Sequence, residues 1–144
     1  MSAMLIPVDG DHPGHTREAI ERAIALCGSG SNLVHLLSVQ LPVSSHVGMF
    51  FAESELRGLH EEMGEEELAA HRQRLADAGV HFDCLVRVGR RAETIAKVAC
   101  ELDCDKVVMG PDRPLGLAAR LTGSVAQQVR HLLAGAGAIE VLGD

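Results

Sequence analysis

The chain has 144 residues, of which 47% are hydrophobic and 23% charged, a composition that suits one folded globular domain and argues against disorder throughout. Its 13 basic residues against 20 acidic ones give a formal net charge of −7, which argues against duplex DNA as a partner because DNA binders need a basic face. Aromatic residues make up only 2%, too few for a platform that stacks single-stranded bases, so we expect no nucleic-acid partner.

The first part of the chain alternates strand-like and helix-like segments. Residues 4–8 form a short apolar run that ends at a turn signal, and residues 16–27 carry their apolar side chains on one helical face. Residues 33–39 are nearly all apolar, which is typical of a strand that is buried on both faces. A loop with an apolar tip follows over residues 40–51.

A long acidic helix is predicted over residues 53–78, and Gly79 ends it. The apolar spacing of this helix slips after Met63, which predicts a bend at that point. Residues 82–88 form the third predicted strand, and the helix that follows is opened by Gly89.

The last part of the chain contains a short apolar strand over residues 106–109 and a loop over residues 110–122 that is rich in glycine, proline and arginine. Ser124 and Gln127 have the spacing of a capping box, so a final helix begins there. The last predicted strand covers residues 138–142, from Ala138 to Leu142.

Five strands that alternate with four helical crossovers predict an α/β fold with one parallel sheet and helices on both faces, a single-domain three-layer α/β/α sandwich. Ligands of such sheets bind beyond the carboxyl ends of the strands, where the strand order reverses. We therefore expect a binding site among residues 9–15, the chain from Val39 onward, residues 89–91 and residues 110–124.

The strongest candidate motif runs from the fourth strand to the last helix. Gly110 follows the strand and allows a ligand to approach the backbone, and Ser124 places a hydroxyl at a helix N-terminus. Such a terminus offers unpaired N–H groups and a partial positive charge, which suit a phosphate. The alternative is that Ser124 only caps its helix.

The sequence resembles the universal stress protein family. The resemblance rests on residues 4–10 (Met-Leu-Ile-Pro-Val-Asp-Gly), 36–39 (Leu-Leu-Ser-Val), 89–110 and 123–126 (Gly-Ser-Val-Ala), which follow in the family's order and spacing. It implies a Rossmann-like fold of the adenine nucleotide alpha hydrolase-like type, with strand order 3-2-1-4-5 and one domain over residues 1–144. It also implies a homodimer in which the last strands pair across a two-fold axis.

Family members that bind ATP carry the motif G-x2-G-x9-G-[S/T]. Gly110, Gly123 and Ser124 match this motif, whereas Arg113 replaces its second glycine. Arg113 lacks the backbone freedom of glycine and precedes Pro114, which favours an extended backbone. Two outcomes stay open: the guanidinium holds a phosphate in place of backbone amides, or it fills the phosphate site.

The resemblance implies that ATP or AMP binds, with Mg²⁺ as a candidate companion. It implies these binding residues besides Arg113: Pro7, Val8, Asp9, Val39, Met109, Gly110, Gly123, Ser124 and Val125. The carboxylate of Asp9 would accept hydrogen bonds from ribose hydroxyls, although an Asp in an Asp-Gly-Asp sequence also forms turns. Pro7 should lie at the end of its strand, because proline donates no ladder hydrogen bond.

Three further features have two interpretations each. Asp9, Asp11, His12 and His15 cluster after the first strand, either as a solvated polar loop or as metal ligands. The arginines at 90 and 91 begin a helix, either as surface residues or as an anion contact. The apolar tip over residues 47–51 either packs under the long helix or forms a lid or partner contact.

The four cysteines lack C-x-x-C spacing and are expected to be reduced, buried filler. We expect a cytoplasmic protein without membrane association, because the sequence shows neither a signal peptide nor an apolar run of about 20 residues.

Common catalytic motifs are missing, including the Walker A and the nucleophile elbow. The sequence therefore predicts a nucleotide-responsive binding module in stress response, with at most slow ATP hydrolysis. The alternative is a dimeric interaction protein that binds no nucleotide because the Arg113 loop blocks the phosphate site.

Overall fold

The structure is a computed structural model that describes residues 2–28, 32–43, 48–110 and 124–143. Arg113, Gly123 and Val47, for which the sequence makes predictions, lie outside these ranges. The strands are β1 (Ser2–Pro7), β2 (Asn32–Gln40), β3 (His81–Val88), β4 (Lys106–Val108) and β5 (Glu140–Leu142). The described helices are α1 (Pro13–Cys27), α3 (Glu53–Asp77), α4 (Arg91–Glu101) and α6 (Val125–Leu133).

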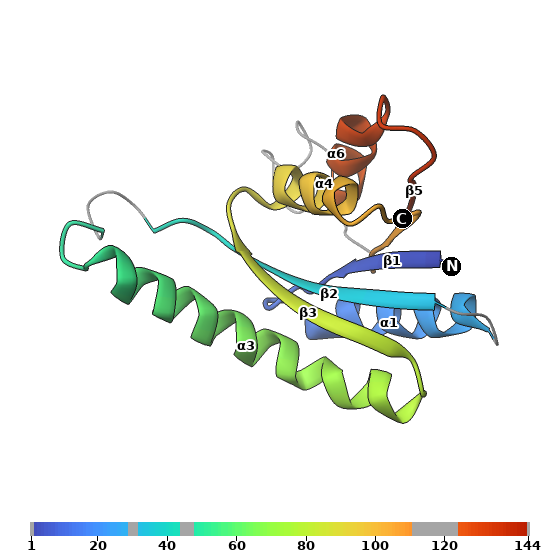
Figure 1. Ribbon diagram of the computed structural model, residues 1–144, viewed down its shortest axis with the longest axis horizontal. Helices are drawn as coiled ribbons and strands as arrows, with labels where there is room; N and C mark the ends of the chain where they lie inside the picture. Colours follow the sequence, from blue (N-terminus) through green and yellow to red (C-terminus); the bar gives the residue numbers. More distant parts are fainter. Residues whose placement is uncertain (1, 29–31, 44–47, 111–123, 144) are drawn as a thin grey trace.

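All neighbouring strands are parallel, and the sheet has the order β3-β2-β1-β4-β5, as predicted. Figure 1 shows α1 and α3 on one face of the sheet and α4 and α6 on the other. The predicted α/β/α sandwich is therefore confirmed. The strand order places β1 at the centre, with β2 on one side and β4 on the other.

Two apolar clusters, one on each face, hold the layers together. Leu5 and Val107 belong to the cluster under α4 and α6, whereas Met4, Ile6 and Val108 belong to the cluster under α1 and α3. Successive residues of a strand point to opposite faces, so a strand covered on both faces is apolar along most of its length. The continuous apolar runs of the sequence reflect this double burial.

The ends of several elements differ from the predictions by a few residues. Helix α1 begins at Pro13 instead of residue 16, because proline fits the first turn of a helix, where no N–H partner is needed. Strand β5 begins only at Glu140, after turns that include Gly137 at a φ of 84°. Pro7 ends β1 as predicted, and the next amide, that of Val8, donates to Leu37 O at 2.8 Å.

Helix α3 runs continuously over 25 residues, so the change in apolar spacing after Met63 does not interrupt it. Its apparent slip has a simple cause: Leu59 and Met63 are 41% and 46% exposed and do not belong to the buried face. The buried positions of the helix are His60, Gly64, Leu68, His71 and Leu75. None of the described helices combines the length and apolarity needed to cross a membrane.

The cysteines are free thiols in two different environments. Cys27 and Cys104 are buried, and burial together with nearby aspartates raises the pKa of Cys104 to about 11. The prediction of four buried cysteines is wrong for Cys100, which lies exposed in the last turn of α4, and Cys84 is only half-buried. Cys100 is exposed because it lies off the face of α4 that carries the buried Ile95, Ala96 and Ala99.

We predict opposite effects for two glycine-to-alanine substitutions in α3. A Cβ at Gly64 would lie 2.6 Å from Val86, so Gly64→Ala should lower the free energy of unfolding by about 1–3 kcal/mol through overpacking. A Cβ at the exposed Gly58 would meet nothing within 4 Å, so Gly58→Ala should raise stability by up to about 1 kcal/mol. Urea unfolding of both variants checks this, and equal effects would contradict it.

Candidate functional site

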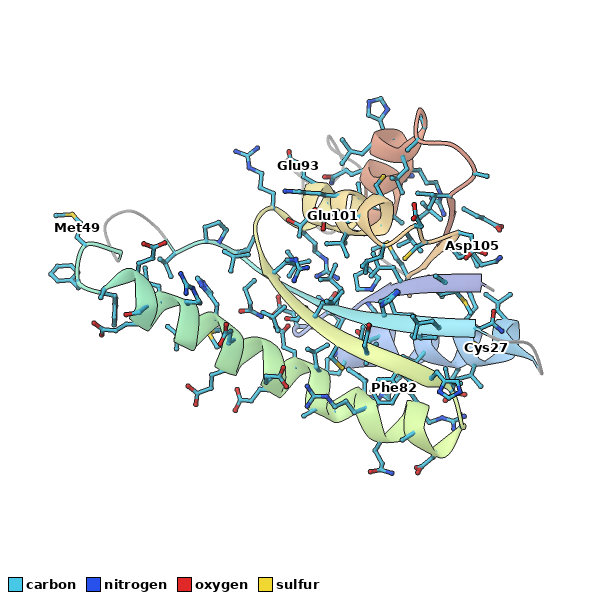
Figure 2. The ribbon with its side chains drawn as sticks, in the orientation of Figure 1. Cys27, Met49, Phe82, Glu93, Glu101 and Asp105 are labelled. Carbon is cyan, nitrogen blue, oxygen red and sulfur yellow. The ribbon has the colours of Figure 1, made fainter. Side chains whose placement is uncertain are left out.

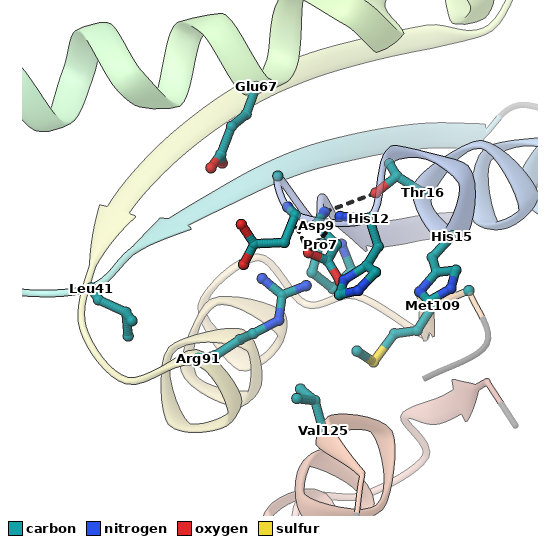
Figure 3. Close-up of a pocket in the computed structure, with 13 residues that line it drawn as sticks. Pro7, Asp9, His12, His15, Thr16, Leu41, Glu67, Arg91, Met109 and Val125 are labelled. Carbon is teal, nitrogen blue, oxygen red and sulfur yellow. Dashed lines mark hydrogen bonds and ion pairs between the residues drawn. The ribbon is translucent and has the colours of Figure 1, made fainter. Parts of the chain in front are cut away.

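A cleft opens where the carboxyl ends of β1 and β4 lie side by side. Strand β2, the next in the chain, pairs with one edge of β1, and β4 pairs with the other edge. This is therefore the point where the strand order reverses. The cavity has a volume of about 320 Å³ (Figure 3). Its lining residues are Pro7, Asp9, Gly10, Asp11, His12, His15, Thr16, Leu41, Glu67, Arg91, Met109, Gly110 and Val125.

Half of the ten predicted binding residues meet in this cleft, namely Pro7, Asp9, Met109, Gly110 and Val125. Val8, Val39 and Ser124 do not line it: Val8 is buried, Val39 packs half-buried on the α4 side of the sheet, and Ser124 is 4% exposed. Arg113 and Gly123 lie outside the described residues.

Asp9 closes a tight turn between β1 and α1. Its Oδ1 accepts hydrogen bonds from the amides of Asp11 and His12 at 3.0 and 3.2 Å, and its own amide donates to Thr16 Oγ1 at 2.8 Å. The turn-forming interpretation of Asp9 is therefore confirmed. Its Oδ2 lies 3.2 Å from His12 Nδ1, so the second carboxylate oxygen faces the neighbouring imidazole.

Gly110 allows β4 and α1 to approach closely. A Cβ at this position would lie 1.9 Å from the carbonyl oxygen of His15, a backbone atom that cannot move aside alone. Position 110, two residues after the end of β4, must therefore be glycine for the first turn of α1 to lie where it does. The need for glycine at position 110 therefore comes from packing against the backbone of His15.

Arg91 lies in the cleft, so surface placement, one of the two interpretations of the arginine pair, does not describe this residue. Its Nη1 donates to the carbonyl oxygen of Val8 at 3.1 Å, and Figure 3 shows the guanidinium extending from α4 toward Asp9. The surface interpretation holds for Arg90, whose side chain is 83% exposed and lies 3.9 Å from Glu93. The two arginines differ because the helix N-terminus directs only the second one toward β1.

Glu67 enters the cleft from α3, far away in the sequence. Its Oε2 accepts a hydrogen bond of 2.6 Å from the buried hydroxyl of Ser38, which in turn accepts one of 3.0 Å from Gln40 Nε2. In the sequence, Glu67 is one of many acidic residues of the long helix predicted over residues 53–78, and nothing there assigns it to the site. The signal that was missed is the position of Glu67, three residues after Gly64 and four before His71. Residues three or four apart share a helix face, and both of these neighbours are buried.

The comparisons with known proteins agree with this architecture. The family model described as "Universal stress protein family" matches residues 1–133. The chain belongs to the universal stress protein family. No curated protein matches the sequence at a significant level.

Solved structures resemble this universal stress protein over nearly its whole length. The hypothetical protein MJ0577 is 23% identical, with a TM-score of 0.74 and coverage of 99% of this chain and 96% of its own. A universal stress protein in complex with cAMP is 19% identical, with a TM-score of 0.71 and the same coverage. A family protein from Arabidopsis thaliana with AMP bound is 15% identical, with a TM-score of 0.63 and coverage of 99% and 92%. At these identities the likeness establishes the fold.

The charges around the cleft of this universal stress protein are mainly negative. Among the described lining residues, three carboxylates (Asp9, Asp11 and Glu67) face one guanidinium, that of Arg91, and two imidazoles. Opposite charges attract and like charges repel more strongly where water is partly excluded. The cleft as described therefore favours a cation or a ligand of small negative charge over a bare polyphosphate.

We predict that Glu67 stabilises the fold through Ser38. Glu67→Ala should lower the free energy of unfolding by about 1–3 kcal/mol, because the buried hydroxyl loses its acceptor. Adding Ser38→Ala should cost less than the sum of the two single changes, since both remove the same hydrogen bond.

The matched control is Glu66→Ala, on the exposed side of the same helix, which should change stability by less than about 0.5 kcal/mol. Denaturant unfolding of all four variants gives these values. Strictly additive effects of the two substitutions would contradict the hydrogen bond.

Proposed function

We propose that this universal stress protein binds an adenine nucleotide in the cleft between β1 and β4 and acts as a nucleotide-responsive module in stress response, as one domain over residues 1–144. One observation carries the proposal: Pro7, Asp9, Met109, Gly110 and Val125, which the family resemblance implies as ligand contacts, all line one cavity at the strand-order reversal. The proteins of known structure with cAMP and with AMP bound support adenine nucleotides as the ligand class.

The described residues suit the nucleoside half of such a ligand. Pro7, Leu41, Met109 and Val125 offer apolar surface for a base. Oδ1 of Asp9 accepts the backbone hydrogen bonds that close the turn, whereas Oδ2 faces His12. Oδ2 therefore provides an acceptor for ribose hydroxyls.

The phosphate half meets a more restricted environment. Ser124 and Gln127 form the predicted capping box, in which Ser124 Oγ accepts from the Gln127 amide at 3.2 Å and Gln127 Oε1 accepts from the Ser124 amide at 3.0 Å. Two amides of the helix start are thereby engaged. Together with the acidic lining, this favours AMP, or ATP whose charge is reduced by Mg²⁺, over free ATP.

We predict that Arg91 is needed for nucleotide affinity and that its neighbour is not. Arg91→Glu adds a fourth carboxylate to the described lining, so the Kd for AMP measured by calorimetry should rise by about 10-fold or more, equivalent to about 1.4 kcal/mol. Arg90→Glu makes the same charge change on an exposed side chain and should leave the Kd nearly unchanged.

Thermal unfolding of both variants controls for loss of fold, because Arg91 also bonds to the backbone of Val8. Absence of binding heat with both AMP and Mg-ATP, together with no nucleotide released from the purified protein, would overturn the proposed function. The Arg113→Gly variant then separates two roles: tighter ATP binding identifies the guanidinium as a block, and weaker binding identifies it as a ligand.

A second candidate is a dimeric interaction protein that binds no nucleotide. Met49, Phe50 and Phe51 support it, since their side chains are 80%, 74% and 44% exposed before the start of α3, so packing under the helix is wrong for these residues. Strand β5 lies at one edge of the sheet, where it can pair with a second copy. Sedimentation analysis that shows a dimer without bound nucleotide would favour this candidate, and a monomer that binds AMP would exclude it.

A further inference from the structure

A carboxylate and two imidazoles converge at the entrance to α1. One ligand atom each from Asp9, His12 and His15 lies within 4.8 Å of the others, the one such group of metal-binding side chains among the residues described. The two imidazole rings are stacked, with centroids 4.8 Å apart and planes 7° from parallel. Figure 3 shows both rings on the same side of the cleft as Asp9.

The local fold explains why these three side chains meet. Asp9 bends the chain through its turn hydrogen bonds, His12 is the N-cap of α1, and Pro13 fixes the first helical residue. His15 then follows three positions after His12, and residues at this spacing lie on the same side of a helix. The Asp-x-x-His-x-x-His spacing therefore places three donor groups on one side of the turn.

We propose that Asp9, His12 and His15 bind a divalent first-row transition metal ion, for which Zn²⁺ is the best match. Imidazole nitrogens select Zn²⁺, Ni²⁺ or Cu²⁺ over Mg²⁺, which prefers oxygen ligands. Three protein ligands with a further position open to another group are the usual arrangement of a reactive zinc site. The inference goes beyond the proposed function, because the protein's own side chains supply the ligands without any nucleotide.

The cluster must contract to hold an ion. Ligand atoms bonded to a tetrahedral Zn²⁺ at about 2.0–2.2 Å lie about 3.3–3.6 Å apart, so separations of up to 4.8 Å in the cluster must shrink by up to about 1.5 Å. The exposed His12 can make this shift by giving up its contact with Asp9 Oδ2.

The surrounding charges favour a cation. Asp11 and Glu67 also line the cleft, and their negative charges exceed the single positive charge of Arg91. The N-terminal end of α1 opposes this attraction, but its partial charge is small beside the gain from three metal–ligand bonds. Because all three ligands line the cleft, the remaining coordination positions of the ion are open to water or to an anionic group bound there.

Titration of the chelator-treated protein with Zn²⁺ alone tests the proposal. We expect one equivalent of Zn²⁺ to bind, and more tightly than Mg²⁺. His12→Gln and His15→Gln should each weaken Zn²⁺ binding by more than the roughly 10- to 100-fold that loss of an outer-shell partner causes. His131→Gln, a matched change at an exposed histidine of α6, should leave the affinity unchanged.

Cobalt spectroscopy separates this site from binding by cysteine. The Co²⁺ complex should show no thiolate charge-transfer band and should keep its spectrum in Cys100→Ser, which removes the exposed thiol. A thiolate band that disappears in Cys100→Ser, unchanged affinity in both His12→Gln and His15→Gln, or no Zn²⁺ binding by the folded parent would each overturn the proposal. Thermal melts confirm that the variants fold, and AMP titrations with a chelator present test the nucleotide site separately.

Discussion

The close contact between Gly110 and the carbonyl oxygen of His15 determines the shape of the cleft. A Cβ at Gly110 would lie 1.9 Å from that oxygen, so the exit of β4 and the first turn of α1 approach at a distance that only glycine allows. The contact brings Met109 and the Asp9 turn to the same cavity. The nucleotide site proposed for this protein depends on this approach, and the proposed metal ligands line the cleft that it shapes.

The sequence was a reliable guide where burial alone decides the structure. The apolar runs of β1 and β2 are covered on both faces, so hydrophobicity identified them, and the capping box at Ser124 identified the start of α6. Glu67 was missed for a physical reason. Its place in the cleft depends on the packing of α3 across β2 and β3, where Gly64 and two histidines complete a buried face that apolar spacing does not reveal.

Charge explains why the chemistry of this universal stress protein is not settled by its fold. The family fold supplies a cleft at the strand-order reversal, but the described lining carries more negative than positive charge. Asp9 connects the two proposals, since its Oδ1 is engaged in the turn and its Oδ2 faces His12. A cation held beside Asp9 would offset the acidic lining, which would allow a phosphate group to enter the same cleft.

Amide NMR spectra of the protein titrated with AMP test most directly whether the cleft between β1 and β4 is the ligand site. We expect the chemical-shift changes to concentrate in the amides of residues 8–12 and 14–16, at Leu41, Arg91, Met109 and Gly110, and in the first turn of α6. Changes centred instead on the hollow between α1 and α3, lined by Arg17, Glu21, His71 and Arg74, would contradict it. So would a spectrum that AMP does not alter.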